Sequence, residues 1–251
     1  MSDKIPVVEI FGPSLQGEGP NVGARCIFVR VKGCDFSCDF CDSKFTWNSR
    51  QSFKQDFSIY DLSMTLLRRC REANCKRVIL TGGNPCLYDF TQVLLNLRGE
   101  GIKVDIETQG SLFPMWLAYI DTIVFSPKPP SSGMPDTYDK IVKYLNGDVS
   151  KSAKIAIKIP VFNDEDIEFA RRYAKFVNEY TKQDPERPKP DIKMYLSVGN
   201  SDVDTTESIR DRVLSDYEKL LNKINEFPTD FENIYILPQI HTLVWGNKQG
   251  V

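Results

Sequence analysis

Short apolar segments alternate with amphipathic segments along the chain. The apolar segments have the length and the β-branched content of buried strands, and they lie at 7–11, 26–31, 77–80, 102–106, 122–125, 155–159, 194–196 and 233–237. Between several of them apolar residues recur every three or four positions, which predicts helices over 59–71, 165–180 and 208–225. Ser58 is a suitable N-cap for the first helix, and Asp61 falls in its first turn. This alternation predicts an α/β fold with a mostly parallel sheet, either a β/α barrel that is complete or incomplete, or an open doubly wound sheet.

Polar segments follow most of the predicted strands directly, at 81–85, 107–110, 126–130, 197–200 and 238–241. In either architecture ligands bind at the carboxyl ends of the strands, so these segments predict the rim of a ligand site. The segment 12–20 has three glycines and two prolines, so we expect a loop there instead of a helix or strand. Two more segments are predicted to be irregular: 128–136, a loop over the rim, and 181–191, a charged and proline-rich surface insertion.

Composition narrows the class of protein. A length of 251 residues suits one domain over 1–251, and 41% hydrophobic with 26% charged residues is ordinary for a globular protein. The net charge of −2 and the lack of a basic block argue against a nucleic-acid partner. The chain has no signal peptide and no run of eighteen apolar residues, so we expect no membrane association. Seven cysteines without a secretion signal indicate a reducing cytoplasm.

Three cysteines stand close together in the spacing Cys-x3-Cys-x2-Cys: Cys34, Cys38 and Cys41. A ferredoxin-type cluster takes four cysteines, one per iron, so three cysteines leave one iron open for an outside ligand. A structural zinc site would need a fourth ligand, but the only other close pair is Cys70 and Cys75, and the chain has one histidine. Zinc and unrelated buried cysteines remain the alternatives to an iron–sulfur loop. The other four cysteines are expected to be packing residues: Cys26, Cys70, Cys75 and Cys86.

The three-cysteine loop resembles the cluster-binding loop of the radical S-adenosylmethionine (SAM) superfamily. Seven motifs make the whole chain similar to the 7-carboxy-7-deazaguanine synthase family. They are QGEG at 16–19, FVRVKGC at 28–34, CDSKFTW at 41–47, TGGNP at 81–85, ETQG at 107–110, SPKPPSS at 126–132 and HTLVWGNKQGV at 241–251.

This resemblance implies an abridged, TIM-like β/α barrel of the radical SAM type that forms a homodimer. It implies a lyase that converts 6-carboxy-5,6,7,8-tetrahydropterin to 7-carboxy-7-deazaguanine with loss of ammonia, in the biosynthesis of queuosine and related 7-deazapurines. It also implies a 4Fe–4S cluster, SAM, Mg²⁺ and a flavodoxin- or ferredoxin-type electron donor.

The resemblance assigns site residues as well. Cys34, Cys38 and Cys41 would hold the cluster, and Ser43 would be a Mg²⁺ ligand where some relatives carry threonine. The positions that match SAM contacts are Phe40, Cys41, Asp42, Gly83, Glu107, Ser126, Pro127, Lys128 and Asn200; Ser197 stands where some relatives have glutamine. The positions that match substrate contacts are Leu15, Gln16, Gly17, Glu18, Arg30, Thr81, His241 and, through its terminal carboxylate, Val251. No side chain is assigned as the catalytic group, because the cofactor generates the radical.

Residue chemistry agrees with several of these assignments. Gln16 and Glu18 can pair with the donors and acceptors on the edge of a pterin, and Arg30 offers a bidentate fork for its carboxylate. Glu107 suits a ribose hydroxyl, although a salt bridge at the rim is the alternative. A lone histidine is more often structural than functional, and only the resemblance makes His241 a substrate contact. The apolar run at 243–245 predicts that the tail 241–251 docks at the active site.

Two other functions fit the cysteine loop. Another radical SAM enzyme, such as a glycyl-radical activase, would act on a protein and would need no small-molecule pocket. A non-enzymatic zinc-binding interaction module would contain zinc instead of iron and would be colourless.

Overall fold

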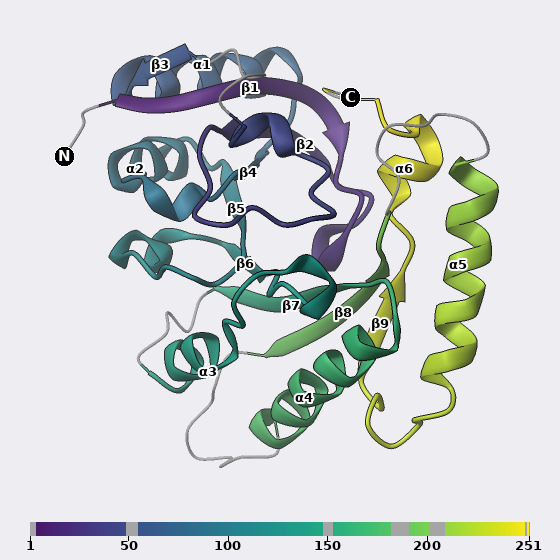
Figure 1. The fold of residues 1–251 in the computed structure, drawn as a ribbon. Coiled ribbons are helices and arrows are strands. Elements are labelled where there is room, and N and C mark those ends of the chain that lie inside the picture. The colour runs from purple at the N-terminus through teal and green to yellow at the C-terminus, as the bar shows by residue number, and fades with distance from the viewer. Residues whose placement is uncertain are drawn as a thin grey trace.

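The computed structural model describes residues 4–48, 55–147, 153–181, 191–200, 209–248 and 250. These residues form one nine-stranded sheet in the order β3-β1-β2-β4-β5-β6-β7-β8-β9, with helices on its outer side (Figure 1). The strands are β1 (Lys4–Leu15), β2 (Arg25–Val31), β3 (Gln55–Ser58), β4 (Arg77–Gly82), β5 (Lys103–Thr108), β6 (Thr122–Phe125), β7 (Lys154–Val161), β8 (Ile192–Val198) and β9 (Ile234–Leu237). The helices are α1 (Ile59–Glu72), α2 (Thr91–Gly99), α3 (Tyr138–Asn146), α4 (Asp164–Thr181), α5 (Ile209–Ile224) and α6 (Ile240–Trp245).

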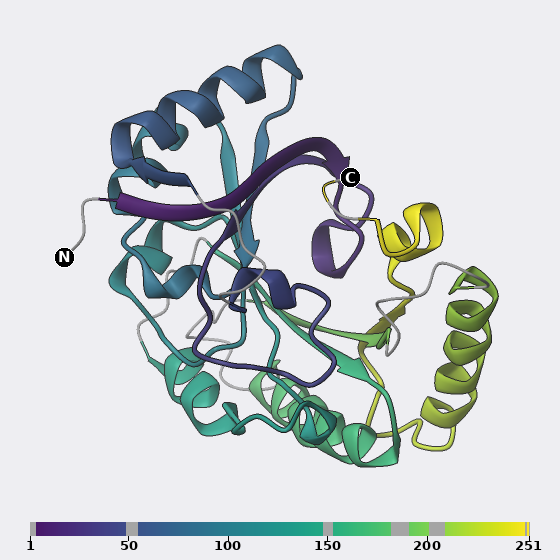
Figure 2. The same ribbon diagram turned by 45° about the horizontal axis from the view of Figure 1, so that its top comes forward.

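The sheet is an incomplete barrel. From β2 through β9 every hydrogen-bonded pair of neighbours is parallel, while β1 pairs antiparallel with both β2 and β3. The sheet curves around a central space and does not close, because β3 and β9 are its two edges (Figure 2). This architecture confirms the prediction of an abridged, TIM-like β/α barrel.

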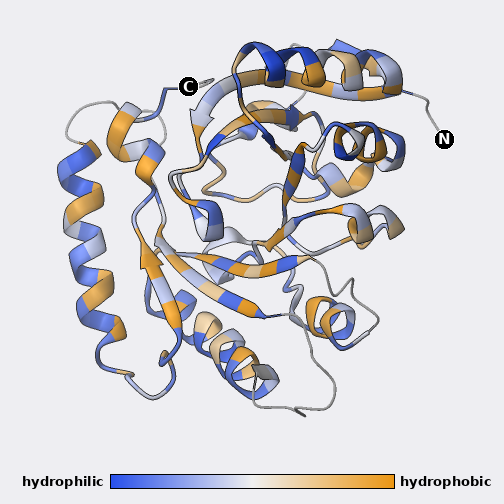
Figure 3. Ribbon diagram, turned by 180° about the vertical axis from the view of Figure 1, so that it is seen from behind, coloured by the Kyte–Doolittle hydropathy of each residue, from blue (hydrophilic) through white to orange (hydrophobic). Residues whose placement is uncertain are grey.

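The core forms between the sheet and the helices that cover it. Helix α1 buries Leu62, Leu66 and Cys70 on one face, and the Ser58 hydroxyl caps its first turn by accepting a hydrogen bond from the Asp61 amide at 3.0 Å, as predicted. Figure 3 shows hydrophobic and hydrophilic residues alternating along the outer helices, as one-sided burial requires. The four cysteines predicted to be packing residues are buried and free, which confirms that prediction.

The predicted loop at 12–20 is wrong in its first part, because β1 continues through it to Leu15. The pairing register with β2 shifts between Phe11 and Ser14, so a bulge accommodates the Gly-Pro pair within the strand. Gly12 has φ +107°, and a Cβ there would lie 2.7 Å from the Cys26 carbonyl oxygen, so only glycine fits. The remaining residues of the connection form a true loop that contains one 3₁₀ turn, Gly19–Asn21.

Other predictions differ from the structure in smaller ways. The short edge strand β3 and the nine-residue helices α2 and α3 were not predicted from the sequence; all three are short, although α3 buries Ile141 and Leu145 on one face. The loop at 128–136 contains a 3₁₀ turn, Pro130–Ser132, which the Asp166 carboxylate holds through the amide and the hydroxyl of Ser131 at 3.1 and 2.7 Å. Most of the predicted insertion at 181–191 lies outside the described residues. None of the described helices is long and apolar enough to cross a membrane.

Candidate active site

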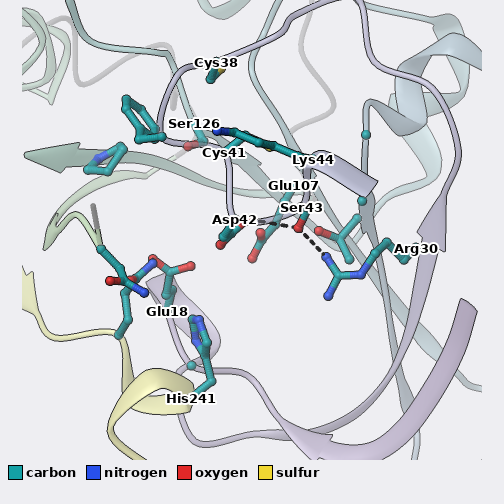
Figure 4. Close-up of a pocket in the computed structure, with 18 of the residues that line it drawn as sticks. Glu18, Arg30, Cys38, Cys41, Asp42, Ser43, Lys44, Glu107, Ser126 and His241 are labelled. Carbon is teal, nitrogen blue, oxygen red and sulfur yellow. Dashed lines mark hydrogen bonds between the residues drawn. The ribbon is translucent and has the colours of Figure 1, made fainter. Parts of the chain in front are cut away.

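A cavity of about 590 Å³ lies at the carboxyl ends of the parallel strands. The residues after β4, β5, β6, β8 and β9 all contribute to its lining, together with the β1–β2 connection and the cysteine loop. Figure 4 shows Cys38 and Cys41 on one side of the cavity and Glu18 and His241 on the other, with Asp42, Ser43 and Glu107 between them. The cavity therefore brings together segments that are far apart in the sequence.

The three cysteines of the loop after β2 line this cavity together. The pKa of the Cys38 thiol is raised to about 11, chiefly by burial; Lys128 opposes this shift, and the neighbouring thiols of Cys41 and Cys34 contribute to it. N–H groups approach two of the sulfurs, since the Phe36 amide lies 3.4 Å from Cys34 Sγ and Trp47 Nε1 lies 3.4 Å from Cys41 Sγ.

The donor set fits an iron–sulfur cluster. Among the described residues, no group of three His, Cys, Asp or Glu side chains converges on a point that could hold a single metal ion. A cluster needs a wider arrangement, because each thiolate binds a different iron, and its sulfurs accept hydrogen bonds from N–H groups of the kind found here. Three adjacent thiols in one cavity, flanked by such donors and by a lysine, meet this requirement.

The end of β4 passes very close to the start of the cysteine loop. The amide of Asn84 donates to the Gly33 carbonyl at 2.8 Å, and the amide of Gly83 donates to the Val31 carbonyl at 3.2 Å. A Cβ on Gly83 would lie 1.8 Å from the Gly33 oxygen, so the contact is possible only without a side chain. The TGGNP segment therefore fixes the position from which the cysteine loop departs.

Arg30 is held in one orientation at the side of the cavity. Its Nε donates to Glu9 Oε1 at 2.7 Å, and its Nη1 donates to Ser43 Oγ at 2.9 Å. The rings of Phe11 and Phe45 lie 5.4 and 5.5 Å from its guanidinium carbon, within the range of cation–π contacts. The guanidinium is thus oriented before any ligand binds.

A buried ammonium group lies between two carboxylates on the other side. Lys158 Nζ is 2.8 Å from Glu18 Oε2 and 3.8 Å from Glu107 Oε2. Gln239 donates to Glu18 Oε1 at 3.2 Å, and Gln16 donates to Glu107 Oε1 at 2.8 Å. Burial by itself would raise the pKa of Glu18, but the charges of Lys158 and His241 and the hydrogen bonds from Lys158 and Gln239 outweigh it and lower this pKa to about 2. Glu18 is therefore an ionised acceptor.

Most of the residues that the sequence singled out line this one cavity. They are Leu15, Gln16, Gly17, Glu18, Arg30, Cys34, Cys38, Phe40, Cys41, Asp42, Ser43, Thr81, Gly83, Glu107, Ser126, Lys128, Asn200 and His241. Pro127 and Ser197 are not among the lining residues, and the buried Ser197 hydroxyl has no hydrogen-bond partner within the described part of the chain. Val251 lies outside the described residues.

Sequence reasoning missed Lys158, Gln239 and Glu9, which hold the charged groups of the cavity in place. Lys158 did leave a signal, because it is the single charge within the otherwise apolar run 155–161 of β7, and its side chain is only 9% exposed. A charge that interrupts a buried strand needs a partner, and such positions are often functional.

An incomplete β/α barrel with a Cys-x3-Cys-x2-Cys loop at the rim of its cavity defines the class of radical SAM enzymes. The family model of the Radical SAM superfamily matches residues 28–174. The 7-carboxy-7-deazaguanine synthase of Bacillus subtilis is 37% identical over 100% of both chains, and that of Bacillus cereus is 39% identical over 99% of both. The chain belongs to the 7-carboxy-7-deazaguanine synthase family, as its motifs predicted.

Solved structures show the same fold. The crystal structure of QueE from Escherichia coli has a TM-score of 0.64 and 23% identity and covers 95% of each chain. Streptococcus suis SuiB has a TM-score of 0.56 and 19% identity, and the match covers 85% of this chain and 49% of that one. At these identities the likeness concerns the fold alone. No relative or structure named here supports the two other functions considered from the sequence, a glycyl-radical activase or a zinc-binding module.

Proposed function

We propose that this cavity converts 6-carboxy-5,6,7,8-tetrahydropterin to 7-carboxy-7-deazaguanine, a lyase reaction with loss of ammonia in 7-deazapurine and queuosine biosynthesis. The full-length similarity to 7-carboxy-7-deazaguanine synthases supports this substrate. The single observation that carries the proposal is that one cavity is lined by three adjacent thiols and by directional partners for a carboxylated pterin.

The thiol side of the cavity is proposed to hold the cofactors. Cys34, Cys38 and Cys41 bind a 4Fe–4S cluster, which with SAM supplies one-electron radical chemistry when bound. The proposed SAM contacts are Phe40, Asp42, Gly83, Glu107, Ser126, Pro127, Lys128 and Asn200. The carboxylate of Glu107, which lines the cavity, supports this assignment, since it suits a ribose hydroxyl.

The other side is proposed to hold the pterin. Glu18 accepts hydrogen bonds from the amino and amide N–H groups of the pterin, and Gln16 pairs with its remaining edge. Arg30 binds the substrate carboxylate with its oriented guanidinium. Leu15, Gly17, Thr81, His241 and the terminal carboxylate of Val251 complete this proposed substrate site.

Mg²⁺ is proposed to bind at Ser43. Its hydroxyl is an oxygen ligand beside the Asp42 carboxylate, which lies 2.9 Å away, and Mg²⁺ commonly takes few protein ligands together with substrate oxygens. Arg30 Nη1 donates to the same hydroxyl, and the hydroxyl donates to Asp42, which leaves one lone pair of the oxygen for a cation.

The chain is further proposed to act as one domain over 1–251, with the tail 241–251 docked at the active site. Lining residues from the first strand to Gly250 support this unit. A homodimer in the cytoplasm, reduced by a flavodoxin- or ferredoxin-type donor and without nucleic-acid or membrane partners, completes the proposal. The net charge of −2 is in keeping with it.

Product analysis tests the proposed function. Anaerobically reconstituted protein is incubated with the carboxypterin, SAM, Mg²⁺ and dithionite, and 7-carboxy-7-deazaguanine is expected to accumulate beyond the amount of SAM consumed. Omitting dithionite is the control and should give no product. Stoichiometric 5′-deoxyadenosine without the deazaguanine would contradict this substrate.

Arg30→Lys is expected to lower kcat/KM for the carboxypterin by roughly 10- to 100-fold, chiefly through KM. Lysine keeps the positive charge but loses the bidentate fork of the guanidinium, its hydrogen bond to Glu9 and its contacts with the two aromatic rings. Steady-state kinetics measure the change. Arg25→Lys, at the exposed start of the same strand, is the matched control and should leave KM unchanged.

A further inference from the structure

Lys158 occupies an unusual position for a lysine. It lies within β7, between Ile157 and Ile159, which are both completely buried. Its own side chain is 9% exposed and points into the cavity, where it meets Glu18 from the β1–β2 connection and Glu107 from β5. A lysine that is buried to this extent requires compensating charges, and here two carboxylates supply them.

We propose that Lys158 is the positioning residue that keeps Glu18 and Glu107 together in one cavity as carboxylates, so that Glu18 presents two acceptor oxygens to the substrate. The inference rests on the proposed function and adds to it a residue that no motif or assigned contact contains. Lys158 itself need not touch the substrate, because it acts through Glu18.

Among the groups around Glu18, Lys158 is the cation that forms an ion pair with it. The charged or titratable groups that face the site are Lys158 from β7, His241 from α6, Glu107 from β5 and, acting on Lys158, Asp42 from the cysteine loop. Gln239 contributes a neutral donor at 3.2 Å. Two carboxylates at 2.8 and 3.8 Å from one Nζ repel each other as soon as that ammonium is removed. Repulsion and burial then both favour a proton on one of them.

A proton on Glu18 would weaken binding of the pterin. The amide and amino edge of a pterin offers two adjacent N–H donors, and an ionised carboxylate accepts both. A protonated carboxyl has one acceptor oxygen and one O–H donor, which would face a donor of the substrate. An unpaired donor in a buried site costs about as much as a lost charged hydrogen bond, so affinity falls.

Equilibrium binding of the carboxypterin at varied pH tests the proposal. Cluster-loaded protein is titrated with the pterin without SAM or reductant, so no turnover contributes. From about pH 6 to about pH 8.5 Glu18 stays ionised in the wild type and adds no pH dependence to the affinity, so each variant is compared with the wild-type profile, which also includes His241. Lys158→Met should weaken binding by roughly 10- to 100-fold at neutral pH. Its affinity should recover as the pH rises, since the carboxylate whose pKa is now raised loses its proton.

Three further variants separate this role from a structural one. Lys158→Met/Glu107→Gln removes the repelling carboxylate as well, so it should bind the pterin more tightly than Lys158→Met and with less pH dependence. Lys158→Arg keeps a cation and should keep the pH profile of the wild type. Lys193→Met, on the neighbouring strand β8 with an exposed side chain, is the matched control and should behave like the wild type.

The outcomes are distinguishable. An unchanged affinity in Lys158→Met, or an equal loss in the single and double variants with no pH dependence in either, overturns the role of Lys158 but leaves the proposed function standing. Failure of the wild-type protein to bind the pterin overturns both. If Lys158→Met does not fold, as judged by its thermal unfolding, Lys158→Arg decides. The wild-type pH profile at near wild-type affinity supports the proposal, and a loss of affinity with a pH dependence that the wild type does not show contradicts it.

Discussion

Cys38→Ala is expected to abolish both the assembly of the 4Fe–4S cluster and the formation of product. Three protein thiols hold three of the four irons and leave one open for SAM, and the described part of the cavity offers no fourth cysteine to replace one of them. Cys38 is 6% exposed and is the middle cysteine of the loop in sequence, so its removal leaves only two protein ligands for the cluster. Iron analysis and the anaerobic visible spectrum should show a nearly colourless protein, and activity should fall below detection.

Cys70→Ala is the matched control for this variant. Cys70 is also a buried free cysteine, but it lies on the inner face of α1 and does not line the cavity. Its removal deletes one small buried group, which should cost about 1 kcal/mol of unfolding free energy and leave the iron content unchanged. A Cys38→Ala protein with the wild-type spectrum and activity would exclude Cys38 as a ligand.

The sequence predicted the fold well where local patterns decide it. The helix capped by Ser58 and the strand Thr122–Phe125 appear where they were expected, because a cap residue and a β-branched apolar run are local signals. The prediction failed at Gly12-Pro13, where a bulge permits the strand to continue. That bulge depends on the pairing with β2, which a local reading of the chain does not contain.

For the candidate site, the sequence predicted the lining residues but not the residues that pair with them. The motifs identified segments that the fold brings to one cavity, because the carboxyl ends of parallel strands meet at one rim. The partners of those residues could not be predicted. Lys158 and Glu18 are 140 residues apart, and Gln16 and Glu107 are 91 residues apart, so their contacts depend on the tertiary structure. A charge inside an apolar run indicates that a partner exists but does not identify it.

Gly83→Ala is expected to have the second large effect, although it adds a single methyl group. The new Cβ would lie 1.8 Å from the Gly33 carbonyl oxygen and 2.5 Å from the Gly33 carbonyl carbon, and both of these are backbone atoms. A flexible side chain could move away from such a contact, but here the start of the cysteine loop or the end of β4 must shift. We expect a loss of about 3 kcal/mol or more in unfolding free energy and a reduced iron content. Chemical denaturation and iron analysis measure these two effects.

Gly99→Ala is the matched control, because it makes the same chemical change at the end of α2, where nothing outside the local helix backbone lies within 4 Å of the new Cβ. Alanine suits a helix better than glycine, so this variant should be as stable as the wild type or more stable by up to about 1 kcal/mol. If Gly83→Ala loses stability but Gly99→Ala does not, steric contact with Gly33 is the cause and not the loss of a glycine as such. If Gly83→Ala instead keeps its stability and a full cluster, the backbone approach between β4 and the cysteine loop is not needed to position the three thiols, and these ligands must be oriented by the loop itself.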